Sequence, residues 1–168
     1  MNILAIETSC DETSAAIVQD GIKVLSNVVA SSSSMHEKYG GIVPEVASRE
    51  QLRCILPTIQ EALSQARCDY NRIDRIAVTI GPGLIGSLLI GVETAKTIAY
   101  VTKKPIIPVN HVLAHIYANF LNYQLSILPA SPAGRNYQFP AIALVVSGGH
   151  TELFLMNSVK KLQWLGEP

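Results

Sequence analysis

Apolar residues follow two different spacings along this chain of 168 residues. Near the start, NILAIET and SAAIVQD are short runs rich in β-branched and apolar residues, and IKVLSNVVA follows Gly21. Such runs, separated by the turn residues SCDET and by a glycine, are typical of neighbouring antiparallel strands. The first 30 residues therefore predict a β-hairpin that is extended by a third strand.

A helical spacing begins after the serine run at residues 31–34 and the loop HEKYGG. Pro44 suits the first turn of a helix, and five apolar residues then recur at helical spacing. They are Leu52, Ile55, Leu56, Ile59 and Leu63. Pro57 lies inside this segment, and because proline has no backbone N–H it predicts a kink or a break there.

Strand and helix patterns alternate in the next part of the chain. RIAVTI predicts a buried strand that ends at GPG, a helix is expected from about Leu84 to Tyr100, and KPIIPV predicts another strand. Asn110 is a suitable N-cap for a further helix. Three strands followed by alternating helices and strands predict a mixed α/β sheet covered by helices. This is the order of a ribonuclease-H-like lobe of the actin, Hsp70 and sugar-kinase superfamily.

The C-terminal part has a weaker pattern. NYQLSILPASPAGRNYQFP contains three prolines and little periodicity, so we expect a surface loop or an insertion. AIALVVS and TELFLMN flank GGH and predict a second hairpin. We expect no internal repeat and no second lobe within the chain.

Composition excludes several classes of protein. A hydrophobic content of 48% with 15% charged residues is typical of a globular chain. The 13 basic and 13 acidic residues cancel, so RNA binding would need a local patch or a basic partner. Three cysteines without C-x-x-C spacing predict reduced thiols in a cytosolic protein. The sequence shows neither a signal-peptide pattern at its start nor an apolar run long enough for a membrane span.

The stretch NHVLAHIYANF places two histidines one helical turn apart. Val112, Ile116 and Phe120 form an apolar row, and His111 and His115 lie on the opposite, polar row. Two imidazoles at this spacing can bind one metal ion, although a tight site needs a third or fourth ligand. A solvated helix face explains the same pattern, so both interpretations stay open.

Three turns are further candidates for ligand binding. Asp11 in SCDET can orient a metal ion or water beside bound phosphates, or it is an ordinary turn residue. GPGLIG offers exposed amides to an anion, but a tight turn with close helix–sheet packing explains it better. In SGGHTEL, Ser147, Gly148 and Gly149 offer amides and a hydroxyl to a polar ligand, although two glycines also form a plain hairpin turn. HEKYGGIVPEVASRE is either a solvated loop and helix start or a binding edge.

Five of these stretches occur in the order found in the tRNA N6-adenosine threonylcarbamoyltransferases, formerly called O-sialoglycoprotein endopeptidases. They are ILAIETSCDETSAAIV, HEKYGGIVPEVASRE, GPGLIGSLLIGVETAK, NHVLAHIYA and VSGGHTEL. The chain resembles the N-terminal part of that family from Met1 to about Asn157. The resemblance implies an N-terminal actin-like ATPase lobe over residues 1–157. Residues 158–168 would begin the crossing to a second lobe that this chain lacks.

The resemblance also implies a reaction and a set of site residues. The family transfers a threonylcarbamoyl group from threonylcarbamoyl-adenylate to the N6 amine of adenosine 37 in tRNAs that read ANN codons. His111 and His115 match its metal ligands, which hold one iron (Fe²⁺) or zinc ion, and Asp11 matches an acidic residue important for activity. The family's substrate-binding strand and turn match Val145, Val146, Ser147, Gly148 and Gly149.

Partners and location follow from the same resemblance. We expect tRNA and threonylcarbamoyl-adenylate as substrates, a shorter paralogue and an ATPase as partner subunits, and a cytoplasmic location without membrane contact; a homodimer is an alternative. Three departures from the family stand out. Leu113 and Ala114 make the histidine helix less polar than usual, and Gln51 stands where a histidine commonly follows SRE. The chain also has about half the family's length, without the lobe that supplies an aspartate ligand, so we expect it to be inactive alone.

Three other functions stay as alternatives. A small kinase or ATPase of the same superfamily would need phosphate-binding loops from two lobes. A non-catalytic scaffold lobe that pairs with a related subunit is compatible with the short chain, although the family's scaffold paralogue lacks the histidine pair. A metallopeptidase is disfavoured because Val112 stands where an H-E-x-x-H motif needs its glutamate.

Overall fold

The computed structural model describes residues 1–121, 138–147 and 151–166. The chain divides into two compact units, Met1–His111 and Val112–Pro168. The proline-rich segment that is expected to be a loop lies almost entirely outside the described residues, as do Gly148 and Gly149. Within the described residues, no helix combines the length and the apolar character that crossing a membrane requires.

Unit 1 contains a five-stranded mixed sheet in the order β3-β2-β1-β4-β5. Its antiparallel part is formed by β1 (Asn2–Glu7), β2 (Glu12–Gln19) and β3 (Lys23–Ser31), as the alternating pattern predicts. β4 (Arg75–Gly81) pairs parallel with β1, and β5 (Ile106–Asn110) pairs parallel with β4. The three predicted N-terminal strands and the two later strands of this unit are therefore confirmed.

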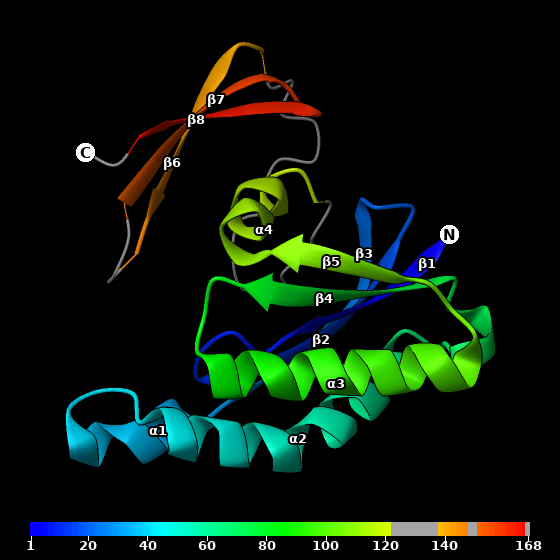
Figure 1. Ribbon diagram of the computed structural model, residues 1–168. Coiled ribbons are helices and arrows are strands. Elements are labelled where there is room, and N and C mark those ends of the chain that lie inside the picture. Colours follow the sequence, from blue (N-terminus) through cyan, green and yellow to red (C-terminus); the bar gives the residue numbers. More distant parts are fainter. Residues whose placement is uncertain (122–137, 148–150, 167–168) are drawn as a thin grey trace. The chain divides into compact units, whose positions relative to one another are not determined.

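Two long helices, α2 (Pro44–Gln65) and α3 (Ile85–Thr102), pack against each other and against the sheet of unit 1 (Figure 1). α2 contacts β2 and β3, and α3 contacts β4, β1 and β5. Shorter elements are α1 (Ser33–His36) and the 3-10 helices Glu37–Tyr39 and Tyr70–Arg72. α2 runs without a break through Pro57. The break allowed by the sequence is absent because burial of the apolar residues on either side stabilises the helix beyond the cost of one proline.

The core of unit 1 lies between the sheet and these two helices. Leu4 and Ile17 from neighbouring strands are fully buried, and they share one cluster with Ile59 of α2 and Ala95 of α3. Alternation along a strand sends every second side chain to the same face. One face of β1 and β2 therefore supplies the core. The helices α2 and α3 that pack on this face hold both strands, and with them the turn that joins the strands.

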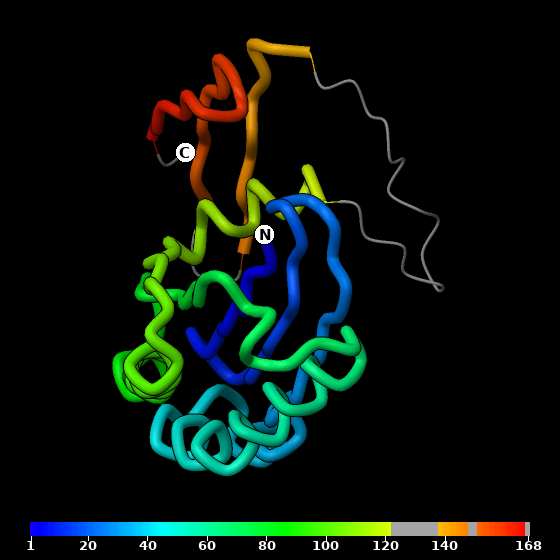
Figure 2. The backbone as a smooth tube through the Cα atoms, turned by 90° about the vertical axis from the view of Figure 1, so that its right-hand side faces the viewer, coloured from blue at the N-terminus to red at the C-terminus, as the bar shows by residue number. Residues whose placement is uncertain are grey.

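Unit 2 holds a separate three-stranded antiparallel sheet in the order β6-β7-β8. β6 (Ala141–Val146), β7 (Thr151–Ser158) and β8 (Lys161–Gly166) follow one another as neighbouring orange to red segments (Figure 2). The hairpin of β6 and β7 is confirmed, whereas sequence analysis assigns no strand to β8. Val112 and Ile116 of α4 (His111–Ala118) pack with Phe154 and the apolar residues around it. The domain boundary at residue 157 stays a prediction.

Candidate functional site

The turn between β1 and β2, residues 8–11, is the best fixed polar feature of unit 1. Thr8 and Ser9 are buried, and Asp11 is partly exposed. A Cβ at Gly83 would collide with the backbone and side chain of Ser9, and one at Gly91 would collide with Thr8 Oγ1. Gly83 of the GPGLIG stretch and Gly91 of α3 therefore allow close packing against this turn, as the interpretation of GPGLIG as a tight turn with close helix–sheet packing predicts.

His111 lies beside this turn. Its Nδ1 is 3.1 Å from Ser9 Oγ and 3.5 Å from Glu7 Oε2. The N–H of Ser9 donates to Glu7 Oε1 at 2.5 Å, so carboxylate, hydroxyl and imidazole form one connected group. A carboxylate that engages one ring nitrogen of a histidine sets the tautomer and the orientation of the ring. The structure thus brings the first predicted metal ligand next to the turn that carries Asp11.

Glu7 is the charged member of this group. Burial raises the pKa of its carboxyl, but hydrogen bonds from Ser9 and Thr79 and the nearby His111 outweigh that effect and hold the pKa below its ordinary value. Glu7 is therefore an anion at neutral pH. Sequence analysis missed both Glu7 and Ser9 because they look like the end of a strand and a turn residue. Only the parallel arrangement of β1, β4 and β5 brings them near His111.

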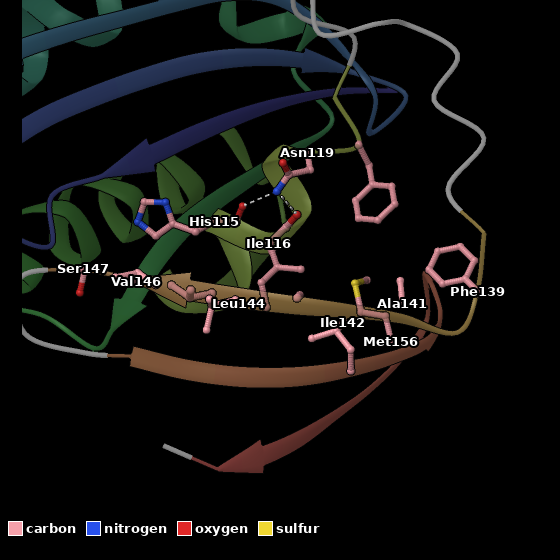
Figure 3. Close-up of a pocket in the computed structure, with 13 residues that line it drawn as sticks. His115, Ile116, Asn119, Phe139, Ala141, Ile142, Leu144, Val146, Ser147 and Met156 are labelled. Atoms are coloured by element: carbon pink, nitrogen blue, oxygen red, sulfur yellow. Dashed lines mark hydrogen bonds between the residues drawn. The ribbon is translucent and has the colours of Figure 1, made fainter. Parts of the chain in front are cut away.

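His115 is exposed and lines a pocket of about 470 Å³ within unit 2 (Figure 3). The view draws His115 and Ser147 toward one end of this pocket and Phe139 toward the other. Val145 and Val146 also line it, and Asn119 donates to the carbonyls of the last turns of α4. Three predicted substrate-binding residues and the second predicted metal ligand therefore share one pocket, whose size suits a small molecule.

The remaining predicted site residues have different positions. The backbone carbonyl of Asp11 accepts hydrogen bonds from the N–H and the hydroxyl of Ser32, at 3.1 and 2.6 Å. His36 of the HEKYGG stretch is buried, with Nε2 3.2 Å from Ser32 Oγ and Nδ1 accepting from the N–H of Val43. His36 therefore supports the turn, whereas most of the residues that follow it in the stretch are exposed. Gly148 and Gly149 lie outside the described residues.

The described residues bear on two kinds of chemistry, metal binding and the reactivity of the cysteines. Residues 1–121, 138–147 and 151–166 contain no group of three His, Cys, Asp or Glu side chains that could hold a metal ion. Cys10, Cys54 and Cys68 are free thiols, as predicted for a chain without a disulfide framework. Burial raises the pKa of Cys10. The thiol next to Asp11 is therefore protonated at neutral pH and is a poor nucleophile.

Solved structures with low sequence identity share this fold. YeaZ from Pseudomonas aeruginosa matches 99% of this chain and 65% of its own length, with a TM-score of 0.58 at 15% identity. A PPX-GPPA enzyme of Aquifex aeolicus matches 98% of this chain and 52% of its own, with a TM-score of 0.50 at 12% identity. At such identities the likeness concerns the fold alone. The predicted fold class, a mixed α/β sheet covered by helices, is confirmed.

Sequence comparison is more specific. A tRNA N6-adenosine threonylcarbamoyltransferase of Syntrophomonas wolfei is 52% identical over 165 residues, which are 98% of this chain and 45% of that protein. The chain thus spans about half the length of this curated relative. The family profile described as TsaD, tRNA N6-adenosine threonylcarbamoyltransferase, matches residues 23–168. With these matches, the chain belongs to the tRNA N6-adenosine threonylcarbamoyltransferase family.

Proposed function

We propose that this chain forms the N-terminal part of an enzyme that transfers a threonylcarbamoyl group from threonylcarbamoyl-adenylate to the N6 amine of adenosine 37 in tRNAs reading ANN codons. The observation that carries the proposal is the 52% identity to a relative of that name, together with the His111, Ser9 and Glu7 group at the turn of Asp11. The part of the relative that this chain does not match would supply the rest of the site.

Asp11 is the residue that we assign to proton removal. The transfer forms a bond between the N6 nitrogen and the carbamoyl carbon, breaks the bond from that carbon to the adenylate oxygen, and releases AMP. The attacking amine must lose one proton, and a positioned carboxylate can accept it. The support for Asp11 is its partial exposure on a turn whose backbone is held in place.

His111 and His115 are assigned to one iron or zinc ion. Such an ion, when bound, polarises the carbamoyl carbonyl as a Lewis acid. The fit of His111 is supported by the contacts of Nδ1 with Ser9 and Glu7, because metal-binding histidines usually engage the other ring nitrogen in this way. Two histidines do not complete a tetrahedral site. Further ligands would come from outside the described residues, from another polypeptide or from solvent.

Val145, Val146 and Ser147, with Gly148 and Gly149 beyond the described residues, are assigned to binding of the adenylate. The pocket that the first three share with His115 supports this proposal. Apolar walls suit the flat base of the adenylate, and the Ser147 hydroxyl can orient a polar group. tRNA would approach the same site as the second substrate, in the cytoplasm.

A partner subunit of related fold is proposed for the outer side of α2 and α3. Each of these helices carries two apolar side chains that lie one turn apart and are more than half exposed. They are Leu52 and Leu56 on α2, and Ile85 and Leu89 on α3. Exposed apolar rows on two adjacent helices are typical of a helix–helix interface. The scaffold function remains the second candidate, because the same surface would serve a lobe that only pairs with the enzyme. An ATPase subunit stays a prediction from the family resemblance.

Transfer is tested with the purified chain, tRNA and threonylcarbamoyl-adenylate, with and without the part of the Syntrophomonas wolfei relative that this chain does not match. We expect modified adenosine, detected by mass spectrometry, when both parts are present. Asp11→Asn should lower the rate by about 100-fold, as for loss of a general base. If the two parts associate but never modify tRNA, the scaffold function replaces the transferase.

Metal binding is tested on the same chain. We expect iron or zinc, measured by mass spectrometry, to be bound by the wild-type protein and lost in the His111→Ala, His115→Ala double variant. Asn119→Ala, directly after the same helix, is the control. Equal metal content in all three proteins would remove the metal assignment.

A further inference from the structure

Every backbone carbonyl from residue 8 to residue 12 accepts a hydrogen bond from another part of unit 1. The carbonyl of Ser9 accepts from the N–H of Leu84, and that of Cys10 accepts from Ser87 Oγ. The carbonyl of Asp11 accepts from Ser32. Five consecutive carbonyls held from outside the turn leave its backbone little freedom.

One side chain accounts for three of these five acceptors. Nε2 of Gln51 lies 3.4 Å from the carbonyl oxygen of Thr8, 2.9 Å from that of Cys10 and 3.1 Å from that of Glu12. Gln51 comes from α2 and is 39 residues away in sequence from Glu12, the nearest of the three acceptors. A primary amide has two N–H groups, so the longest of the three contacts is shared. The donors of Gln51 are therefore fully used on this turn.

Gln51 is only 1% exposed, and its Oε1 has no hydrogen-bond partner within the part of the chain that the structure describes. The reverse orientation of the amide would place Oε1 against three carbonyl oxygens, so the hydrogen-bond network fixes which atom faces the turn. A buried acceptor without a partner is costly. An apolar residue would avoid that cost but would remove a donor from three carbonyls, of which only that of Cys10 also accepts from Ser87 Oγ. The amide of Gln51 therefore stabilises the conformation of the turn, at the cost of one buried acceptor without a partner among the described residues.

We infer that Gln51 is a positioning residue, which holds the β1–β2 turn in one conformation and thereby fixes where Asp11 presents its carboxylate. The inference rests on the proposed function for what Asp11 does, but not for how the turn is held. Gln51 touches no assigned reacting group. It acts through the backbone on both sides of Asp11, because its acceptors belong to Cys10 and Glu12.

The first test measures backbone hydrogen exchange of the chain alone. Gln51→Met keeps the length of the side chain and removes its donors. We expect exchange of the amides of residues 9–12 to become about tenfold faster, with a change below about threefold in β4. Ser26→Ala is the matched control, since Ser26 Oγ donates a buried hydrogen bond to the Ala62 carbonyl of the same helix. If both variants change the turn equally, Gln51 is a general packing residue and the inference fails.

The second test uses the isosteric Gln51→Glu variant. A carboxyl among three carbonyl oxygens is favoured in its neutral form, which donates one hydrogen bond, whereas its anion repels them. Protection of residues 9–12 should therefore be kept at low pH and lost as pH rises through the folded pKa of the new carboxyl. The wild-type chain should show no such step. A profile that matches Gln51→Met at all pH values would contradict the inference.

The third test separates this inference from the proposed function. In the assembled transfer assay, Gln51→Met should lower kcat by about tenfold with the KM for tRNA unchanged, and Ser26→Ala should not. Hydrogen exchange needs neither tRNA nor adenylate. If wild-type protein is inactive but Gln51→Met loosens the turn, the proposed function fails and the holding role of Gln51 stands. If Gln51→Met is fully active with a rigid turn, the inference is overturned.

Discussion

Two antiparallel meanders in this chain, β1-β2-β3 and β6-β7-β8, belong to different units but have the same register in their first hairpins and, except where bulges shift the pairing, in their second. In each, a strand of six residues is joined by four residues to a strand of eight. A shift of 138 residues converts the pair Ile3↔Val18 into the pair Ala141↔Met156, since 3 and 138 make 141 and 18 and 138 make 156. The same shift converts Val18↔Val24 into Met156↔Leu162.

The two meanders differ in which face is buried. In unit 1, α2 and α3 cover the face of Leu4, which is fully buried. Its counterpart after the shift, Ile142, is 60% exposed, because α4 packs on the opposite face of β6 and β7 among the residues described. Equal strand patterns therefore give equal strand pairing. Which face becomes a core depends on the helices that cover it.

The first turns of the two meanders differ as well. The turn of unit 1 carries Asp11 and is held by α2, α3 and Ser32. Its counterpart in unit 2 begins at Ser147, at the pocket that His115 also lines. Both turns bear proposed site residues.

The largest contrast is expected for Leu4→Ala and Ile142→Ala, which truncate counterparts in the two meanders. Leu4→Ala leaves a cavity and should lower the free energy of unfolding by about 3 kcal/mol, whereas Ile142→Ala should cost less than about 1 kcal/mol. The loss for Leu4→Ala is measured by urea unfolding, with circular dichroism as the signal. Fluorescence of the single tryptophan, Trp164, follows unit 2. Similar losses would mean that the face of Ile142 is covered in solution.

On the other face of the meanders, we expect the larger loss in the free energy of unfolding in unit 2 and the smaller loss in unit 1. Met156 is 3% exposed beneath α4, whereas its counterpart Val18 is partly exposed. Met156→Ala should lower the free energy of unfolding of unit 2 by about 2 kcal/mol, and Val18→Ala should have a smaller effect on unit 1. The same two probes measure both. A larger loss for Val18→Ala would contradict the assignment of opposite core faces.

Packing of the turn of unit 1 is tested by two glycines of one helix. Gly91→Ala should lower the free energy of unfolding by about 1–3 kcal/mol, because its Cβ meets Thr8 Oγ1. Gly86→Ala is the control, since its Cβ meets only Ser48 at 3.5 Å, an ordinary contact. Alanine has the higher helix propensity, so this variant should be neutral or more stable by up to about 1 kcal/mol. Thermal unfolding of both variants measures the two changes in stability. Equal destabilisation of the two variants would contradict close packing at Gly91.

The smallest effect concerns Glu7, whose counterpart in unit 2 is the apolar Val145. The folded pKa of Glu7 lies below its ordinary value of 4.5, so its ionised form stabilises the folded chain above that pH. The stability difference between wild type and Glu7→Gln should be largest near neutral pH and should shrink as pH falls below about 4.5. Urea unfolding across this range measures it, with the exposed Glu37→Gln as control. A difference independent of pH would show that the charge has no role.

Most local elements of this chain could be predicted from its sequence. Alternating and helical spacings located seven strands and three helices because each reflects a repeat of two or of about 3.6 residues. These spacings missed β8, whose run KLQWLG has a lysine and a glutamine among few apolar residues, and with it the repeat of the two meanders. Of the kink or break predicted at Pro57, the break is absent, since α2 continues to Gln65.

The candidate site was only partly accessible to the same reasoning. His111, His115 and Asp11 could be selected from motif and spacing, and they keep their roles as proposals. Glu7, Ser9 and Gln51 could not be selected. Gln51 did carry two signals, since it replaces the histidine that commonly follows SRE and is a polar residue beside the apolar row of α2, where it proves to be buried. Its partners lie about 40 residues earlier, and no local pattern points to them.

By itself, the sequence determined most of the strands, the long helices, the family and the candidate ligands, because hydrophobic periodicity and short motifs are properties of neighbouring residues. Only the tertiary structure decided that His111 meets Ser9 and Glu7, that Gln51 holds the turn of Asp11, and that the two meanders bury opposite faces. These features depend on hydrogen bonds and packing between segments far apart in the chain. Their energies arise only once the sheet and its helices have assembled.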